Sequence, residues 1–161
     1  MARLGISLAL AFAVTIDPAH WINATSIARV ELGHSRAKYR ALFGRPQAAG
    51  VVVGLVRVRF PNRHVEGFFR PRTDRTVAML TWDHRDVTLD RIGPCTSFRA
   101  FRRAYGDAPP VRIGGRVVAY RLGRLVFTLD RRRLRIANVM LALPGIPATL
   151  ALREPTCRLP P

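Results

Sequence analysis

The sequence predicts an α+β fold built from two successive units, each a short helix followed by an antiparallel meander. Two short amphipathic segments with capping residues, 33–44 and 95–106, predict the helices. Each segment precedes stretches of β-like sequence that Pro, Gly, Asp and Arg residues divide into strands. With 161 residues, of which 48% are hydrophobic, the chain can bury one core without help from a metal.

The N-terminus has the composition of a secretory signal peptide. Arg3 gives it a positive start, the stretch Leu4 to Ala13 is apolar throughout, and small residues near its end suit cleavage. The stretch is shorter than the roughly 18 to 20 residues that a spanning helix needs. We therefore predict that residues 1–13 are removed on export, leaving a single domain, 14–161, without a transmembrane segment. The alternative is that the same residues form a core strand or helix of a cytoplasmic domain.

The first unit, at about 27–82, begins with the helix around Tyr39. Ser35 is a suitable N-cap, and Gly44, which Arg45-Pro46 follows, ends the helix. The strands expected after it are 51–60, 64–70 and 75–82. In the first of these strands, apolar residues alternate with arginines, which is typical of a half-buried antiparallel strand.

The second unit, at about 92–143, repeats this order. Thr96 or Ser97 caps a helix whose apolar face is formed by Phe98, Phe101 and Tyr105. The strands expected after it are 116–122, 125–130 and 134–143, and a tail, 144–161, follows. We interpret the arginine run at 131–133 as a solvated turn.

The two cysteines, Cys95 and Cys157, have no histidine at metal-ligand spacing, so they do not predict a zinc site. In an exported protein they would form a disulfide and contribute about 4 kcal/mol to stability. In a reducing cytosol they would be two unrelated thiols. Their state therefore depends on the signal peptide.

The formal net charge is +17, from 27 basic and 10 acidic residues, and only Lys38 is a lysine. Such a charge predicts salt-sensitive, sequence-independent binding to polyanions. The spread of arginines along the whole chain also fits the compositional bias of a GC-rich genome. We choose Arg57, Arg59, Arg121 and Arg135 as the candidate binding face, because they point outward from predicted strands and Arg presents a planar fork to carboxylate or phosphate.

The sequence predicts no catalytic residues, no metal site and no cofactor. The densest polar group is Asp83-His84-Arg85-Asp86, where a histidine between carboxylates could act as a general base or the carboxylates could bind a cation. We interpret it as a charged loop, since it follows a strand among turn-forming residues. His20, His34 and His64 show no metal-ligand spacing.

The stretch Val30-Glu31-Leu32-Gly33-His34-Ser35, with Tyr39 and Gly44, resembles a known motif, aliphatic-x-x-Gly-Met-Ser/Thr-x-x-x-Val-x-x-x-x-Gly-x-Pro. This motif opens the repeats of the outer-membrane assembly lipoprotein BamE (SmpA/OmlA) and of the beta-lactamase inhibitor protein. His34 stands in place of the Met and Tyr39 in place of the Val. The resemblance implies one curved sheet with short helices on one face. It also implies an exported protein that binds other proteins and has no catalytic centre.

The sequence thus predicts a secreted or extracytoplasmic bacterial protein that is not an enzyme. It would act as a binding or envelope-associated module, through contacts with an unknown protein partner or an anionic envelope component. The alternative is a basic nucleic-acid-binding protein of the cytoplasm, which the charge alone would favour.

Overall fold

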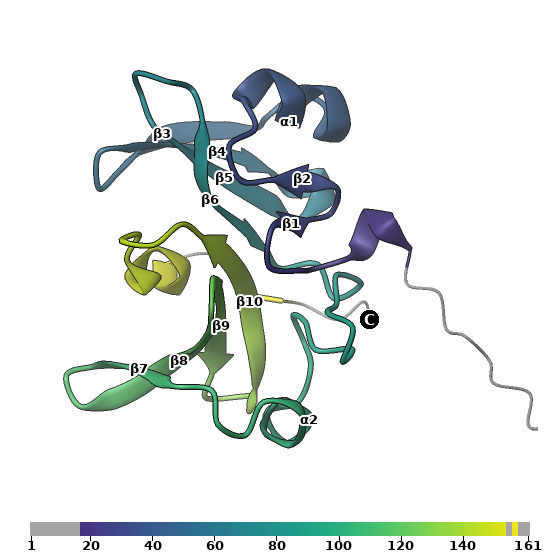
Figure 1. Ribbon diagram of the computed structural model, residues 1–161, viewed down its shortest axis with the longest axis vertical. Helices are drawn as coiled ribbons and strands as arrows, with labels where there is room; N and C mark the ends of the chain where they lie inside the picture. The colour runs from purple at the N-terminus through teal and green to yellow at the C-terminus, as the bar shows by residue number, and fades with distance from the viewer. Residues whose placement is uncertain (1–16, 154–155, 158–161) are drawn as a thin grey trace, which may run out of the picture.

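The computed structural model describes residues 17–153 and 156–157 of the chain. The main element is an eight-stranded antiparallel sheet of order β3-β4-β5-β6-β10-β9-β8-β7 (Figure 1). Its strands are β3 (Ala48–Val52), β4 (Leu55–Phe60), β5 (Val65–Phe69), β6 (Thr76–Thr81), β7 (Pro110–Ile113), β8 (Arg116–Leu122), β9 (Leu125–Asp130) and β10 (Arg135–Ala142). The helices of the described residues are α1 (Arg36–Phe43) and α2 (Phe98–Ala104), with 3-10 helices η1 (Pro18–His20), η2 (Pro61–Arg63) and η3 (Ala148–Arg153). A small ladder joins β1 (Ser26–Ile27) to β2 (Val30–Glu31).

The predicted division into two helix-plus-meander repeats is wrong. The molecule is mostly sheet, and β6 pairs with β10 so that all eight strands form one continuous ladder. In this central pair Thr81 lies opposite Val139 and Met79 lies opposite Leu141. Every residue of β6 is buried, as are all residues of β10 after the first. Strands buried on both faces and both edges belong to a shared core, so neither half is a separate repeat.

The predicted strands also differ from the observed ones. The stretch expected as one strand, 51–60, is the end of β3, a tight turn and β4, because Val53 and Gly54 adopt positive φ angles of 49° and 73°. An apolar run hides this turn from the sequence pattern. The second missed strand is β7, where Pro110 and the following Gly114-Gly115 turn argue against a strand in the sequence.

Both α-helices begin at a serine that caps them. Ser35 Oγ accepts from the backbone N–H of Lys38, and Ser97 Oγ accepts from that of Ala100. The buried side chains of these helices are Tyr39, Phe43 and Phe101. They pack, together with the N-terminal segment, into a single apolar cluster on one face of the sheet.

The opposite face of the sheet is covered by η3 and the chain before it. Leu150 and Ala151 of η3 pack with Phe68, Leu80 and other buried residues of the central strands. None of the helices in the described part of the chain has the length and apolar character that a membrane crossing requires.

Cys95 and Cys157 form a disulfide, with Cα atoms 5.4 Å apart. The backbone N–H of Cys157 also donates to the carbonyl of Ala137, at 2.7 Å. The tail is thus fixed beside β10, near the start of α2. The predicted signal peptide, 1–13, lies outside the described residues.

Candidate functional site

The four arginines of the predicted binding face lie on the face opposite the α-helices, but in separate places. Arg57 and Arg59 are on β4, where they alternate with the core residues of the helix-covered face. Arg121 of β8 and Arg135 of β10 pair with Val126 and Asp130, toward opposite ends of β9. The structure therefore brings together Arg57 and Arg59 and leaves the other two apart from each other.

Arg57 and Arg59 both approach the buried carboxylate of Glu66 on β5. Arg59 Nε donates to Glu66 Oε2 at 2.6 Å, and Arg57 Nε lies 3.8 Å from Glu66 Oε1. The Glu66 side chain has 0% exposure, whereas the two arginine side chains are 29% and 26% exposed. The Arg59 guanidinium also lies 5.8 Å from the centre of the Trp82 ring. These two arginines therefore neutralise a buried charge of the protein itself.

Arg121 and Arg135 are both half-buried. Arg121 donates from Nη2 to the carbonyl of Ile146 at 3.5 Å, which ties β8 to the loop before η3. The backbone of Arg135 bridges to Ser97, the residue that caps α2. Their role in binding stays a prediction.

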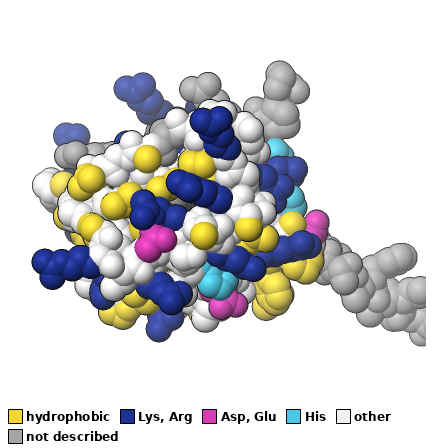
Figure 2. All heavy atoms as spheres, turned by 90° about the horizontal axis from the view of Figure 1, so that it is seen from above, with side chains coloured by type: hydrophobic (Ala, Val, Ile, Leu, Met, Phe, Trp, Pro, Cys, Tyr) yellow, Lys and Arg dark blue, Asp and Glu magenta, His cyan; other side chains and the backbone are white. Residues whose placement is uncertain are grey.

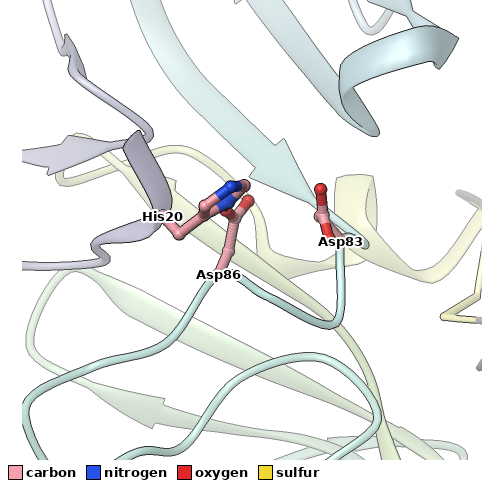
Figure 3. Close-up of side chains that lie close together, drawn as sticks. All are labelled: His20, Asp83 and Asp86. Atoms are coloured by element: carbon pink, nitrogen blue, oxygen red, sulfur yellow. The ribbon is translucent and has the colours of Figure 1, made fainter. Parts of the chain in front are cut away.

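A second polar site joins the N-terminal segment to the loop after β6. His20 of η1 and Asp86 of the loop face each other, with Asp83 nearby, just after the end of β6 (Figure 3). His20 Nδ1 lies 2.9 Å from Asp86 Oδ1, and one ligand-type atom from each of the three residues lies within 4.8 Å of the others. The carboxyl groups are buried, with exposures of 2% for Asp83 and 1% for Asp86.

Each carboxylate oxygen of this site has a partner within the protein. Asp86 binds His20 through Oδ1 and accepts a short hydrogen bond from the Thr81 hydroxyl at Oδ2. Asp83 accepts from Arg85 at both oxygens, from Nε at 3.0 Å and from Nη2 at 2.7 Å. A donor set of two carboxylates and a histidine suits a cation, and the same oxygens here hold contacts within the protein. We call His20, Asp83 and Asp86 the polar lock, because their hydrogen bonds hold the N-terminal segment and the loop after β6 in place.

The two carboxyl groups have opposite pKa shifts. Burial alone would raise the pKa of Asp83, but the hydrogen bonds and charge of Arg85, with the charge of His64, outweigh it and lower the pKa to about 2. Burial raises the pKa of Asp86, against the opposing effect of its hydrogen bonds from Thr81 and His20. Asp83 is thus held ionised, while Asp86 is the group that resists ionisation.

Backbone contacts place the lock. The N–H of Val87 donates to the carbonyl of His20, and the N–H of Ile22 donates to the carbonyl of Val87, both at 2.9 Å. A Cβ on Gly93 would lie 1.9 Å from the Asp86 carbonyl oxygen, so only glycine fits there. Sequence reasoning recognised the loop but missed His20, because 66 residues separate it from Asp86.

The outer surface is more basic than the composition alone indicates. Three acidic side chains, Glu66, Asp83 and Asp86, are buried, so they place no carboxylate at the surface. Lys and Arg side chains are spread over the face in Figure 2 and are not gathered in one stripe, and acidic side chains there are few. The fold thus leaves few acidic side chains among the basic side chains of this face.

Comparison with known proteins gives matches among solved structures alone: no protein-family model matches the chain, and no curated protein is similar to it. The chain is similar to an extracellular protein containing a SCP domain from Bacillus anthracis str. Ames, with a TM-score of 0.54 and 10% identity, over 78% of this chain and 47% of that one. It also aligns with a cysteine-rich secretory protein from Staphylococcus aureus subsp. aureus Mu50, with a TM-score of 0.46 and 9% identity, over 70% of this chain and 43% of that one.

The chain spans about half the length of these two proteins. The match to the Bacillus anthracis protein covers 78% of this chain, whose eight main strands form one continuous ladder and not two repeats. Neither structure bears on the BamE-like motif, which stays a prediction. At 10% identity the likeness to the Bacillus anthracis protein concerns the fold alone.

Proposed function

We propose that this protein is an exported, non-enzymatic module that binds an acidic component of the cell envelope through its arginine-rich surface. The observation that carries the proposal is the basic outer surface: three carboxylates are buried against arginine, threonine or histidine, while most arginines of the described residues are exposed. A surface of this kind attracts polyanions and presents many bidentate donors to them.

The Cys95–Cys157 disulfide supports a location outside the cytosol, since disulfides form and persist in oxidising compartments. One solved structure of similar fold is described as an extracellular protein. The signal-peptide composition of residues 1–13 points the same way. These three observations favour the envelope over intracellular nucleic acid as the source of the anionic partner.

The polar lock is the reason for proposing a binding module rather than an enzyme. Both oxygens of Asp83 and both oxygens of Asp86 hold contacts that fix loops. A general base must instead offer an oxygen within reach of a substrate proton. The chemistry of this cluster is therefore used for structure.

The test combines location with binding. Host cells are treated with a thiol-alkylating reagent and fractionated, and the intact mass of the recovered protein is measured. We expect a processed chain in the envelope or medium, whose two thiols alkylate only after reduction. The purified protein should bind isolated host envelopes and be released by salt.

Arg121→Gln with Arg135→Gln tests the predicted face, with lysine at both positions as the charge-preserving control. Weaker binding in the glutamine pair alone would assign binding to this face. Recovery from the cytosol with two free thiols and bound nucleic acid would contradict the proposed function.

A further inference from the structure

An open pocket of about 560 Å³ lies between the turn that joins β9 to β10 and the chain after η3. Its lining includes Thr128, Asn138, Leu152 and the successive arginines Arg131, Arg132 and Arg133. The volume is within the usual range for small-molecule sites. From the sequence alone, we interpret this arginine run as a solvated turn. Nothing in the sequence pattern indicates that the turn borders a pocket.

The pocket contains a buried hydroxyl group that has no hydrogen bond to any described residue. Thr128 is 6% exposed and lies in register with Ala119 on β8 and Asn138 on β10. Within the part of the chain that the structure describes, no atom accepts from or donates to the Thr128 hydroxyl. The neighbouring Asn138 is 1% exposed, and its amide donates to the Ala151 carbonyl at 3.0 Å. A buried hydroxyl without a partner is costly to folding, and a ligand that binds it would recover that cost.

Asp130 organises the arginine run. Its Oδ1 accepts from the backbone N–H of Arg132 at 3.1 Å and from that of Arg133 at 3.3 Å. This fixes the turn and leaves the arginine side chains exposed at the pocket. Arg133 Nε lies 3.9 Å from Asp130 Oδ2, whereas Arg131 and Arg132 form no ion pair with any described residue.

We propose that this pocket binds the phosphate group of an organic phosphate. Three arginines against one aspartate leave a net charge that matches a phosphate monoester, which carries about −1.5 to −2 at neutral pH. Arginine forks donate paired N–H groups to phosphate oxygens, and the Thr128 hydroxyl supplies a further donor from within the pocket. Apolar lining residues such as Val118 and Leu152 provide contacts for the carbon skeleton. The proposal rests on the proposed binding function and names the ligand chemistry that one site would use.

The experiment follows backbone amide resonances by NMR during titration, at constant ionic strength, with inorganic phosphate, glycerol phosphate or acetate. We expect saturable shifts from both phosphates, centred on residues 128–133 and 137–138. Arg131→Gln with Arg132→Gln should weaken phosphate binding by about tenfold or more, as expected for the loss of charge-assisted hydrogen bonds. The matched control is Arg70→Gln with Arg72→Gln, which removes the same charge from an exposed turn in the other half of the sheet. It should leave the affinity unchanged.

Thr128→Val separates binding from folding. Because the hydroxyl has no partner among the described residues, the ligand-free variant should unfold at the wild-type temperature or above it. Its phosphate affinity should nevertheless fall. A variant that unfolds earlier and binds phosphate normally would show that Thr128 is structural, and would overturn the proposal.

Other outcomes would also overturn it. Shifts spread over all the arginines, with equal losses in both double variants, would indicate general charge attraction. Acetate binding as tightly as phosphate would indicate a carboxylate site, and binding of inorganic phosphate without glycerol phosphate would exclude an organic phosphate. If phosphate fails to bind but the protein still binds envelopes, only the pocket is disproved. If phosphate binds in the pocket of a protein found in the cytosol with free thiols, only the envelope function is disproved.

Discussion

Arg59 of β4 donates to Glu66 of β5 at 2.6 Å, in a cross-strand pair that places a fully buried carboxylate within a protein of formal net charge +17. The pair lies on the sheet face opposite α1 and α2, and Arg57 approaches the same carboxylate. A surface of outward-pointing arginines was expected on β4. Instead, Arg57 and Arg59 stabilise the buried negative charge of Glu66.

Glu66→Ala should lower the free energy of unfolding by about 3 kcal/mol, because breaking a buried ion pair leaves desolvated charge without compensation. Glu66→Gln, which keeps the size and one acceptor, should lower it less. Urea unfolding at neutral pH measures both values. A loss below about 1 kcal/mol for the alanine variant would mean that the pair behaves like a solvated surface salt bridge.

Removing the disulfide should lower stability by about 4 kcal/mol in the chain-entropy account, since Cys95 and Cys157 are 62 residues apart. The variant Cys95→Ser with Cys157→Ser should unfold at the same temperature as the reduced wild-type protein. Thermal unfolding with and without reductant makes this comparison. If reductant lowered the unfolding temperature of the double variant too, the effect would have another origin.

Gly93→Ala should be among the most damaging small substitutions in the chain, with a loss of about 3 kcal/mol or more. The added methyl would clash with the Asp86 carbonyl oxygen. Because this oxygen belongs to the backbone, it cannot rotate away as a side chain could. Gly50→Ala on β3 is the control, because a Cβ there meets nothing within 4 Å. Similar unfolding free energies for the two variants would show that the loop at Asp86 shifts to accommodate the added methyl.

Asp83 should make stability depend on pH. Its pKa in the folded protein, about 2, is below the ordinary 3.8, so ionised Asp83 stabilises the fold above about pH 4. This stability is lost as the pH falls through the folded-state pKa. Asp83→Asn should therefore cost about 2 kcal/mol at pH 7, and its difference from wild type should disappear near pH 2.

Asp86→Asn is the matched control for this pH dependence. Because burial raises the pKa of Asp86, a neutral side chain is favoured there, and the loss at pH 7 should be smaller than for Asp83→Asn. Urea unfolding over a series of pH values distinguishes the two. If the two variants lost the same unfolding free energy at every pH, this would contradict the opposite pKa shifts of the two carboxyl groups.

Features that depend on near neighbours in the chain could be predicted from the sequence. The helix around Tyr39 begins after Ser35 and ends at Gly44 because the cap and the glycine are local signals. The strand expected at 116–122 coincides with β8, which glycine turns bound on both sides. Such signals define single elements but not the ladder that joins them.

Features that depend on distant residues could not be predicted. The pairing of β6 with β10 is set by burial on both faces, and two separate repeats would show the same local pattern. The partners of Asp86 and Glu66 were missed for the same reason, since a charged residue in a loop or strand reads as solvent-facing until the segment that packs against it is known. The hairpin of β3 and β4 was missed because Val53 is an unusual residue for a positive φ.

The central pair of strands also dictates the order in which the molecule can be completed. Strand β6 is followed by the loop, α2 and three further strands before β10 arrives to cover its edge. A chain that emerges from a ribosome or a membrane channel N-terminus first would hold β3 to β6 as a half-sheet with one apolar edge open. The edge of β6 is covered only when β10 has been made, and the Cys95–Cys157 disulfide can form only after Cys157 has followed. We therefore expect the tendency of the newly made protein to aggregate to depend on how quickly β7 to β10 follow β3 to β6.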